Sequence, residues 1–453
     1  MRNLTDLGNS ERLFDNSNGN IKYCPELKKW YCWNGKRWQK DVDGAVMRLA
    51  VQTVRDIPEE ATTSDCSDPK ATVEWAKESE SRHRLNSMVK LAESLPGIPI
   101  GVDKLDTNKY LFNCQNGTID LKLGVLQSHN KNDLITHITD LEYSAYDRDK
   151  HCPRWQQFLI EITGGNTCLI EYIQKFLGYS LSGDTTEHLL HVFHGQGRNG
   201  KGTIFEIIKK ILGDYCVTLS FDAIEKKASN NTLNDTAQMY GKRLVIAQEG
   251  DEGSSLNEPL VKTLTGGDVL AGRFYYAEQF NFFPTHKLIL ATNNKPTIKE
   301  TSDAIWDRLR LIPFEKQFRG DAQDKKLKEK LEAELPGILS WLVEGFAKWQ
   351  CDGLATRHTG IDEASTDYRS EEDVVQHFIQ ECCYENQDCQ IGAKELHKAF
   401  TDWCINSGEK PIPKKIFNNR IRSRGYREHV GAGRMLKFSG IGLADIKYSS
   451  KYS

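Results

Sequence analysis

The chain has 453 residues, of which 38% are hydrophobic and 27% are charged, and its formal net charge is −3. This is the composition of a water-soluble chain long enough for several domains, and no stretch approaches the roughly 18 apolar residues of a membrane helix, so a membrane protein is not expected. The first residues lack the apolar core of a signal peptide, and the twelve cysteines include no C-x-x-C pair, so we expect free thiols in a reducing cytoplasm rather than disulfides or a zinc site.

Residues 1–150 are predicted to form a mixed α+β domain without a nucleotide motif. An aromatic and basic run over 30–39 surrounds Asn34-Gly35, a pair typical of a two-residue type I′ β-hairpin, and that register sets Tyr31 opposite Trp38. Aromatic rings interleaved with lysine and arginine are suited to stacking on single-stranded bases. An aromatic cross-strand pair that only stabilises the hairpin explains the pattern as well.

Further strands and turns are predicted over 111–126, where asparagine and glycine interrupt short apolar runs. A helical stretch then begins near residue 151 and leads into the motif that follows.

The most informative motif is the run Gly-Gln-Gly-Arg-Asn-Gly-Lys-Gly-Thr at residues 195–203, which matches a G-x-x-x-x-G-K phosphate-binding loop. An apolar run over 189–193 predicts a buried strand before it, and apolar residues at helical spacing predict a helix after it that stops at Gly213. In that context, backbone N–H groups and the helix N-terminus would hold phosphates, and Lys201 would reach the β- and γ-phosphates of a nucleotide. The predicted nucleotide-binding residues are Gly195, Gln196, Gly197, Arg198, Asn199, Gly200, Lys201, Gly202 and Thr203.

One position departs from the usual loop. The residue after the lysine is normally serine or threonine, whose hydroxyl binds Mg²⁺, whereas here it is Gly202. Thr203 comes next, but one helical step turns a side chain by about 100°, so its hydroxyl does not automatically occupy the same coordination position. We predict that Mg²⁺ is held by Thr203 together with a carboxylate from elsewhere in the chain.

That carboxylate is predicted to follow a second buried strand, over 243–248. Glu249 directly follows this strand, and an acid at the carboxyl end of a parallel strand faces the bound nucleotide. Glu249 is therefore expected to polarise the attacking water or to hold the metal. Asp251 and Glu252 either join this site or form an exposed turn.

A third strand, over 287–292, ends on Asn293, whose amide is predicted to sense the γ-phosphate or hold the water. A fourth strand, within 306–314, carries Arg308 and Arg310. Arg308, preferred over Arg310, is predicted to act as an arginine finger that stabilises phosphoryl transfer in a neighbouring subunit, and a surface ion pair is the alternative. Lys201, Glu249, Asn293 and Arg308 are the predicted catalytic residues.

Residues 264–284 predict a β-hairpin inserted between the second and third strands. Its tip carries Arg273, Phe274 and Tyr275, a charge beside two aromatic rings that suits gripping the phosphates and bases of a DNA strand. Aromatic core packing is the competing interpretation.

The end of the chain forms a separate basic module. After a packed helix over 335–350 and a linker over 351–373, residues 391–453 contain eight lysines and five arginines against five acids, a net +8 that leaves −11 for the rest. Three amphipathic helices and a hairpin-like wing within 374–453 predict a winged-helix duplex-DNA binder, although a solvated charged face would show the same composition. The predicted contacts are Lys414, Lys415, Arg420, Arg422 and Arg434.

These segments, in this order, resemble superfamily 3 helicases of the phage and plasmid primase–helicase family. The matching runs include the phosphate loop, Lys-Arg-Leu-Val-Ile-Ala-Gln-Glu, Leu-Ala-Thr-Asn-Asn-Lys-Pro and Ile-Trp-Asp-Arg-Leu-Arg-Leu-Ile-Pro-Phe, and upstream Trp-Asn-Gly-Lys-Arg-Trp and Cys-Pro-Arg-Trp. The resemblance implies a helicase-associated domain over 1–150 and, over 151–350, an AAA+-like P-loop core with a parallel sheet.

It also implies a function. The family's members form hexameric rings that hydrolyse ATP with Mg²⁺ between subunits, translocate on one DNA strand and separate the other, with the inserted hairpin lining the pore. A homo-hexamer in the cytoplasm of a bacterial host, with a separate primase or polymerase as a possible partner, is the resulting expectation.

Three other functions stay open. A primase in the same chain would need clustered carboxylates, and a D-x-D run, Asp41-Val-Asp43, lies in a polar turn. A nucleotide kinase shares the Gly-Lys-Gly-Thr ending of the loop. An origin-binding protein without turnover would follow if Gly202 had cost the chain its metal.

Overall fold

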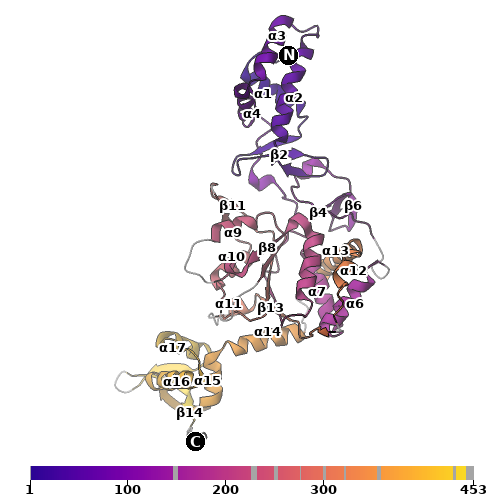
Figure 1. Cartoon of the computed structure of the whole chain (residues 1–453). Coiled ribbons are helices and arrows are strands. Elements are labelled where there is room, and N and C mark those ends of the chain that lie inside the picture. Colours follow the sequence, from indigo (N-terminus) through magenta and orange to yellow (C-terminus); the bar gives the residue numbers. More distant parts are fainter. Residues whose placement is uncertain are drawn as a thin grey trace. The chain divides into compact units, whose positions relative to one another are not determined.

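The computed structural model describes residues 2–145, 151–225, 232–248, 254–275, 277–298, 303–320, 323–354, 359–431 and 435–444. The chain divides into two compact units, Met1–Pro296 with Ile312–Ile361 and Thr297–Leu311 with Asp362–Ser453 (Figure 1). Across the described ranges, no helix combines the length and apolar character needed to cross a bilayer.

The first unit opens with four helices that share an apolar core. They are α1 (Asp6–Asn16), α2 (Ala45–Glu60), α3 (Pro69–Ser79) and α4 (Arg82–Ala92). Leu13, Val54 and Met88 are among the buried side chains between them. The side chains of Thr5, Asp68 and Ser81 accept hydrogen bonds from the first turns of α1, α3 and α4, so the sequence itself fixes where these helices start.

The first unit also contains two small antiparallel sheets. One contains β1 (Ile21–Cys24), β2 (Lys29–Trp33) and β3 (Trp38–Lys40), and the other contains β4 (Leu111–Cys114), β5 (Gly117–Asp120) and β6 (Val125–Gln127). The second sheet confirms the strands predicted over 111–126. Short 3₁₀ turns, η1 (Val102–Lys104) and η2 (Lys131–Asp133), connect the segments.

The predicted register of the first hairpin is wrong. Strands β2 and β3 pair Trp33 with Trp38 and set Tyr31 opposite Lys40, so four residues rather than two form the loop. Asn34 Oδ1 accepts hydrogen bonds from the N–H groups of Lys36 (3.0 Å) and Arg37 (2.9 Å), and this side-chain turn takes up the two extra residues.

A five-stranded sheet in the order β13-β7-β12-β9-β8 forms the centre of the fold. Its strands are β7 (Leu190–His194), β8 (Cys216–Ser220), β9 (Leu244–Gln248), β12 (Lys287–Thr292) and β13 (Leu309–Pro313). The pairs β7–β12, β12–β9 and β9–β8 are parallel. Because both faces of such a sheet are covered, its strands are nearly continuous apolar runs, and this is what the sequence shows. The predicted AAA+-like P-loop core is confirmed.

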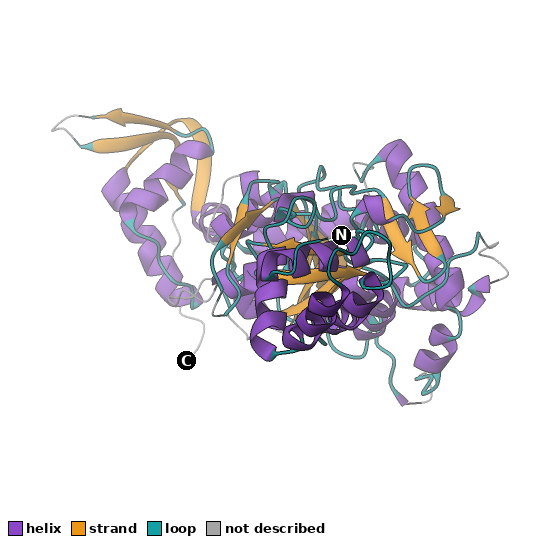
Figure 2. Ribbon diagram, turned by 90° about the horizontal axis from the view of Figure 1, so that it is seen from above, coloured by secondary structure: helices purple, strands orange, loops and turns teal. Residues whose placement is uncertain are grey.

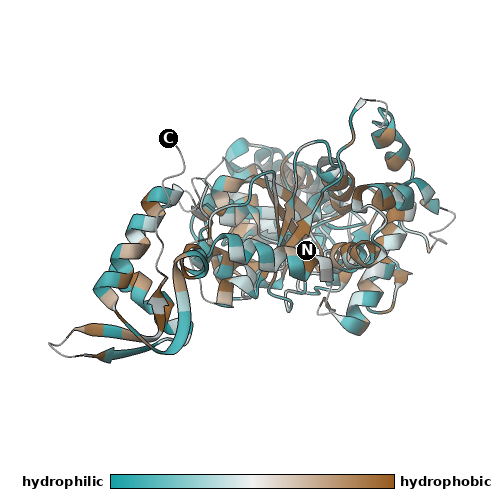
Figure 3. Cartoon of the chain, turned by 90° about the horizontal axis from the view of Figure 1, so that it is seen from below, coloured by the Kyte–Doolittle hydropathy of each residue, from teal (hydrophilic) through white to brown (hydrophobic). Residues whose placement is uncertain are grey.

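Helices cover this sheet (Figure 2). They are α6 (Pro153–Thr163), α7 (Thr167–Tyr179), α8 (Lys201–Leu212), α9 (Thr232–Gln238), α10 (Glu258–Thr265), α12 (Leu327–Glu332) and α13 (Leu335–Asp352), with the turns η3 (Gly213–Tyr215) and η4 (Phe221–Ala223). Helix α13 packs along α7, where the rings of Tyr179 and Trp349 stack with centroids 4.2 Å apart. Hydrophobic colour gathers on the central strands (Figure 3).

Between β9 and β12 in the chain lie β10 (Leu270–Gly272) and β11 (Phe280–Phe282), which pair antiparallel. The hairpin predicted within 264–284 is therefore present. Its tip is formed by residues 273–279, of which residue 276 lies outside the described ranges.

The second unit contains α11 (Asp303–Trp306), most of α14 (Thr359–Glu371), and a C-terminal domain. That domain runs α15 (Val374–Cys382), β14 (Cys383–Gly392), α16 (Ala393–Ser407), α17 (Lys414–Ser423), β15 (Arg427–Val430) and β16 (Leu436–Leu443), with sheet order β14-β16-β15. Helix, strand, two helices and a two-stranded wing are the winged-helix order, so the predicted winged-helix fold is present, and its binding of duplex DNA stays a prediction. Strand β14 was not predicted.

Candidate nucleotide-binding site

The phosphate loop joins the end of β7 to the start of α8, as the sequence predicts. Gly200 has φ +89°, and a Cβ there would lie 2.6 Å from Ile162 Cγ2, so the backbone conformation and the close packing both require glycine. A Cβ on Gly195 would lie 2.2 Å from the carbonyl oxygen of Phe314. Gln196, Gly197 and Arg198 between them are exposed, which leaves the outer side of the loop open to a ligand.

Asn199 braces the loop from inside. Its side chain is 3% exposed, donates from Nδ2 to the carbonyl of Phe314 (3.3 Å), and accepts through Oδ1 from the N–H of Lys201 (3.3 Å). The N–H of Phe318 in turn donates to the carbonyl of Arg198 (2.8 Å). The segment after β13 therefore holds the loop in shape, a role that no local pattern in the sequence indicates.

Lys201 is the centre of the site. Its side chain is 7% exposed, and Nζ donates to the carbonyl of Gly195, to the carbonyl of Thr292 (3.1 Å) and to Oδ1 of Asn293 (3.1 Å). Burial lowers the pKa of this ammonium to about 8, because the carbonyls that surround it carry no full negative charge. A phosphate arriving at the loop would supply that charge.

The structure brings Asn293 to the loop because β12 lies between β7 and β9. The carboxyl end of β12 is thus the direct neighbour of the phosphate loop, and Asn293 contacts Lys201 there. Strand β9 ends on Gln248, which pairs with Ala291 of β12. Glu249, Asp251 and Glu252 follow directly and lie outside the described residues, so their predicted roles stay predictions.

An open cavity of about 750 Å³ adjoins the loop. Arg198, Gly200 and Thr203 form its loop side, and Phe158 of α6 and Phe318 stand among the residues around it. The sequence pointed to the loop but not to these phenylalanines, which come from segments without a nucleotide motif.

Gly202 and Thr203 occupy the first turn of α8. Thr203 is half-buried and lines the cavity beside the loop. Gly202 is exposed, and a Cβ added there would meet no atom within 4 Å. The departure from the usual motif therefore leaves an open position on the helix. Among the residues that the structure describes, no group of three or more His, Cys, Asp or Glu side chains is arranged to hold a metal ion.

At the inserted hairpin, the three predicted DNA-binding residues differ in their surroundings. Tyr275 is 67% exposed and Arg273 is exposed, whereas Phe274 is half-buried and stacks on Phe280 with ring centroids 5.6 Å apart. Core packing therefore applies to Phe274, while DNA binding by the exposed Arg273 and Tyr275 stays a prediction. Glu278 on the same tip forms an ion pair with Lys28 of the first small sheet (2.7 Å).

In the second unit, Arg308 lies half-buried just before β13, while Arg310 donates to the backbone carbonyls of Asp307 and Leu309 (both 2.9 Å). The guanidinium of Arg310 is therefore held close to its own strand, and the choice of Arg308 as the arginine finger stays a prediction.

The winged-helix domain presents fewer free cations than its composition suggests. Lys414 and Lys415 are exposed at the start of α17. Arg422 pairs with Glu428 (2.6 Å), and burial lowers the pKa of Arg420. Arg434 lies outside the described residues.

The D-x-D run of the primase alternative, Asp41-Val-Asp43, has a structural role. Asp41 accepts hydrogen bonds from the N–H groups of Gly44, Ala45 and Val46 (2.8, 2.8 and 3.1 Å) at the start of α2, and Asp43 pairs with Arg48 (2.9 Å). Its carboxylates are engaged as a helix cap and a surface ion pair, so this run is not arranged as a two-metal site.

A parallel sheet in this strand order, a phosphate loop after β7 and a winged helix define an AAA+-like P-loop protein. Residues 10–164 match the model of the D5 N terminal like family, and residues 193–308 match a family of unknown function. The first third of the chain is thus similar to the D5 N terminal like family, and these matches support a kinship with the D5-like primase–helicase proteins.

Relatives carry names of the same kind. The chain is 26% identical over 444 residues to a protein of Acanthamoeba polyphaga mimivirus named "putative helicase". The alignment covers 88% of this chain and 46% of the mimiviral protein. It is 24% identical to a "putative helicase" of Invertebrate iridescent virus 3 (67% and 36% covered) and 21% identical to a "putative primase" of African swine fever virus (67% and 34% covered). The chain thus spans less than half the length of these relatives.

A solved structure, the apo C-terminal region of NrS-1, is 12% identical to the chain and covers 93% of it and 96% of its own chain, with a TM-score of 0.49.

Proposed function

We propose that this chain is a superfamily 3 DNA helicase that works as a homo-hexameric ring and hydrolyses ATP between subunits to translocate on single-stranded DNA. The observation that carries the proposal is the contact of Lys201 with both its own loop and Asn293 at the end of the neighbouring strand. Because of that contact, a phosphate that binds Lys201 would also affect Asn293 at the end of β12. The helicase names of the mimiviral and iridoviral relatives support the same function.

In this function the loop amides of residues 195–203 bind the triphosphate, and Lys201 turns from the carbonyls toward the β- and γ-phosphates. Asn293, which shares the Lys201 ammonium, responds to the γ-phosphate. Glu249, directly after β9, orients the attacking water. The cavity beside Phe158 and Phe318 receives the nucleoside.

Mg²⁺ would neutralise charge on the β- and γ-phosphates. Thr203 fits as one ligand because its hydroxyl lines the cavity, and Glu249 is the proposed second. The exposed hairpin residues Arg273 and Tyr275 grip the translocating strand, and Lys414 and Lys415 of the winged helix contact duplex DNA. The protein would act in the host cytoplasm, beside a separate primase or polymerase.

The direct test is an unwinding assay on forked DNA with ATP and Mg²⁺, together with native mass measurement of the assembly. We expect strand separation that requires ATP, hydrolysis that rises with added single-stranded DNA, and a mass of six chains. A nucleotide kinase would be indifferent to the DNA, and a protein that binds duplex without hydrolysing ATP would be an origin binder. Either result would contradict the proposal.

The metal assignment predicts a specific pair of variants. Thr203→Val keeps the shape of the side chain but removes the hydroxyl, so we expect the Mg²⁺ concentration at half-maximal hydrolysis to rise at least about tenfold. Adding Gly202→Ser, for which the helix has open space, should restore Mg²⁺ affinity in the Thr203→Val background. Titration of hydrolysis against Mg²⁺ measures both. If Thr203→Val matches the unmodified chain, Thr203 is not a ligand.

A further inference from the structure

A second open site lies between the first small sheet and the nucleotide-binding core, within one compact unit. It is a groove of about 520 Å³. Arg37, Trp38 and Lys40 stand on the side of the small sheet, and Asp214, Lys242 and Phe274 stand on the side of the core. It shares no lining residue with the cavity beside the phosphate loop.

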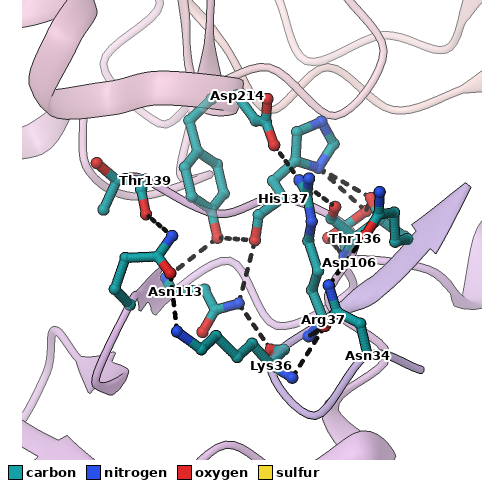
Figure 4. A network of polar contacts seen from close by, with 12 residues as sticks. Asn34, Lys36, Arg37, Asp106, Asn113, Thr136, His137, Thr139 and Asp214 are labelled. Atoms are coloured by element: carbon teal, nitrogen blue, oxygen red, sulfur yellow. Dashed lines mark hydrogen bonds and ion pairs between the residues drawn. The ribbon is translucent and has the colours of Figure 1, made fainter. Parts of the chain in front are cut away.

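The walls of the groove are fixed to each other (Figure 4). Arg37 donates to the carbonyl of Thr136 (3.3 Å) and forms an ion pair with Asp214. Beside it, Lys36 Nζ donates to Gln115 Oε1 (2.9 Å), and Asn113 Nδ2 donates to the carbonyl of Lys36 (3.0 Å). The hairpin loop is therefore bound to its neighbours on both sides, and a preformed groove costs little ordering when a ligand binds.

The groove has more cations than anions. The Lys40 side chain is exposed, but the nearby walls partly desolvate its ammonium and lower its pKa. Burial also lowers the pKa of Lys242, and the charge of Asp214 opposes this shift. Of the acids nearby, Asp214 is already paired with Arg37, and Asp106 accepts from the N–H of Thr136 (2.7 Å) and from its hydroxyl. Two neighbouring ammonium groups, whose nearby acids Asp214 and Asp106 are already engaged by Arg37 and Thr136, favour an anionic ligand.

One wall is aromatic and continues into the inserted hairpin. Phe274, at the tip of that hairpin, lines the groove and is half-buried, while Trp38 and Tyr31 form an inner surface that is 2% and 4% exposed. The ion pair between Lys28 and Glu278 (2.7 Å) joins the small sheet to the same tip. The groove therefore ends where the proposed DNA-gripping residues begin.

We propose that this groove binds a segment of single-stranded DNA, with phosphates on Lys40 and Lys242 and a base against Phe274. A single strand fits better than a duplex, because only unpaired bases offer a free face to an aromatic side chain. The proposal rests on the proposed function, since it supplies the strand's approach to the inserted hairpin. It adds a DNA site formed by the N-terminal sheet itself.

The test is the binding of a short fluorescein-labelled oligo(dT) to the full chain, without nucleotide, by fluorescence anisotropy over a salt series. Lys40→Ala and the double variant Lys40→Ala/Lys242→Ala are compared with Lys77→Ala, an exposed lysine on α3 outside the groove. Each phosphate contact on a single strand contributes a slope of about 0.7 in log affinity against log salt. We expect Lys40→Ala to lose that much slope and about fivefold in affinity at about 0.1 M salt, and the double variant to lose about twice the slope.

Lys242 Nζ also donates to the carbonyl of Asp214 (2.6 Å), so removing Lys242 can lower the stability of the protein. The melting temperature of each variant is therefore measured. If the double variant is unstable, the single Lys40→Ala variant, which removes an exposed side chain, decides the test. An unchanged affinity and slope in Lys40→Ala would overturn the proposal, as would a loss that appears only with a duplex of the same length. Lys201→Ala in the same assay should bind like the unmodified chain. Normal hydrolysis by Lys201→Ala would defeat the ATPase proposal alone, and normal oligo(dT) binding by Lys40→Ala would defeat the groove alone.

Discussion

Replacing Lys201 with alanine is expected to abolish ATP hydrolysis, with a loss of at least about 10²–10³-fold, while the fold persists. The ammonium is the buried cation of the loop, and its bonds to Gly195, Thr292 and Asn293 place it where the phosphates of a bound nucleotide would lie. Its removal takes away the charge that stabilises the transferring phosphoryl group. Steady-state hydrolysis measures the loss, and circular dichroism checks the fold.

The matched control is Lys209→Ala, which removes an exposed lysine from the last turn of the same helix. It should hydrolyse ATP at the unmodified rate. Lys201→Met, which keeps most of the side-chain volume, should fail like Lys201→Ala and so separate loss of charge from loss of packing. An unchanged rate in either Lys201 variant would remove the helicase hypothesis.

Replacing Arg308 with alanine is expected to slow hydrolysis by about 10³-fold or more and to leave nucleotide binding intact, because a finger acts on the transition state in the neighbouring subunit. Mixing Arg308→Ala chains with Lys201→Ala chains should partly restore hydrolysis. Some interfaces in the mixed ring then combine an intact loop from one chain with an intact arginine from the other. Hydrolysis as a function of mixing ratio measures the effect.

Arg310→Ala is the control, since the Arg310 guanidinium binds carbonyls of its own segment and should contribute little to hydrolysis. If mixing restores nothing, Arg308 does not act across subunits. If Arg308→Ala instead loses ATP affinity, its role lies in binding within its own chain.

The spacing of apolar residues was sufficient to predict an element where the buried residues follow the period of a strand or a helix. The strands β7, β9 and β12 are continuous apolar runs because a covered parallel sheet buries both faces, and helix α8 begins at the loop and ends at Gly213 as its spacing predicts. The winged helix was recognised from its amphipathic helices. Its strand β14 was missed because that strand is mostly exposed and polar and is held by pairing with β16 rather than by apolar burial.

The hairpin over residues 30–39 shows the opposite limit. Asn34-Gly35 indicated the turn correctly, but the Asn34 side chain accepts two backbone hydrogen bonds and lengthens the loop to four residues. Because side chains alternate along a strand, the partners of every residue change with the loop. A single side-chain hydrogen-bond pattern therefore decided the register.

The sequence by itself determined the phosphate loop, the amide at Asn293 and the order of the strands along the chain, because each depends on neighbours in sequence. Only the tertiary structure decided that β12 inserts between β7 and β9 and so brings Asn293 to Lys201. It also decided that Phe314 holds the loop and that Lys40 and Lys242 face one groove. These contacts join residues far apart in the chain, and their free energy comes from packing that no local period encodes.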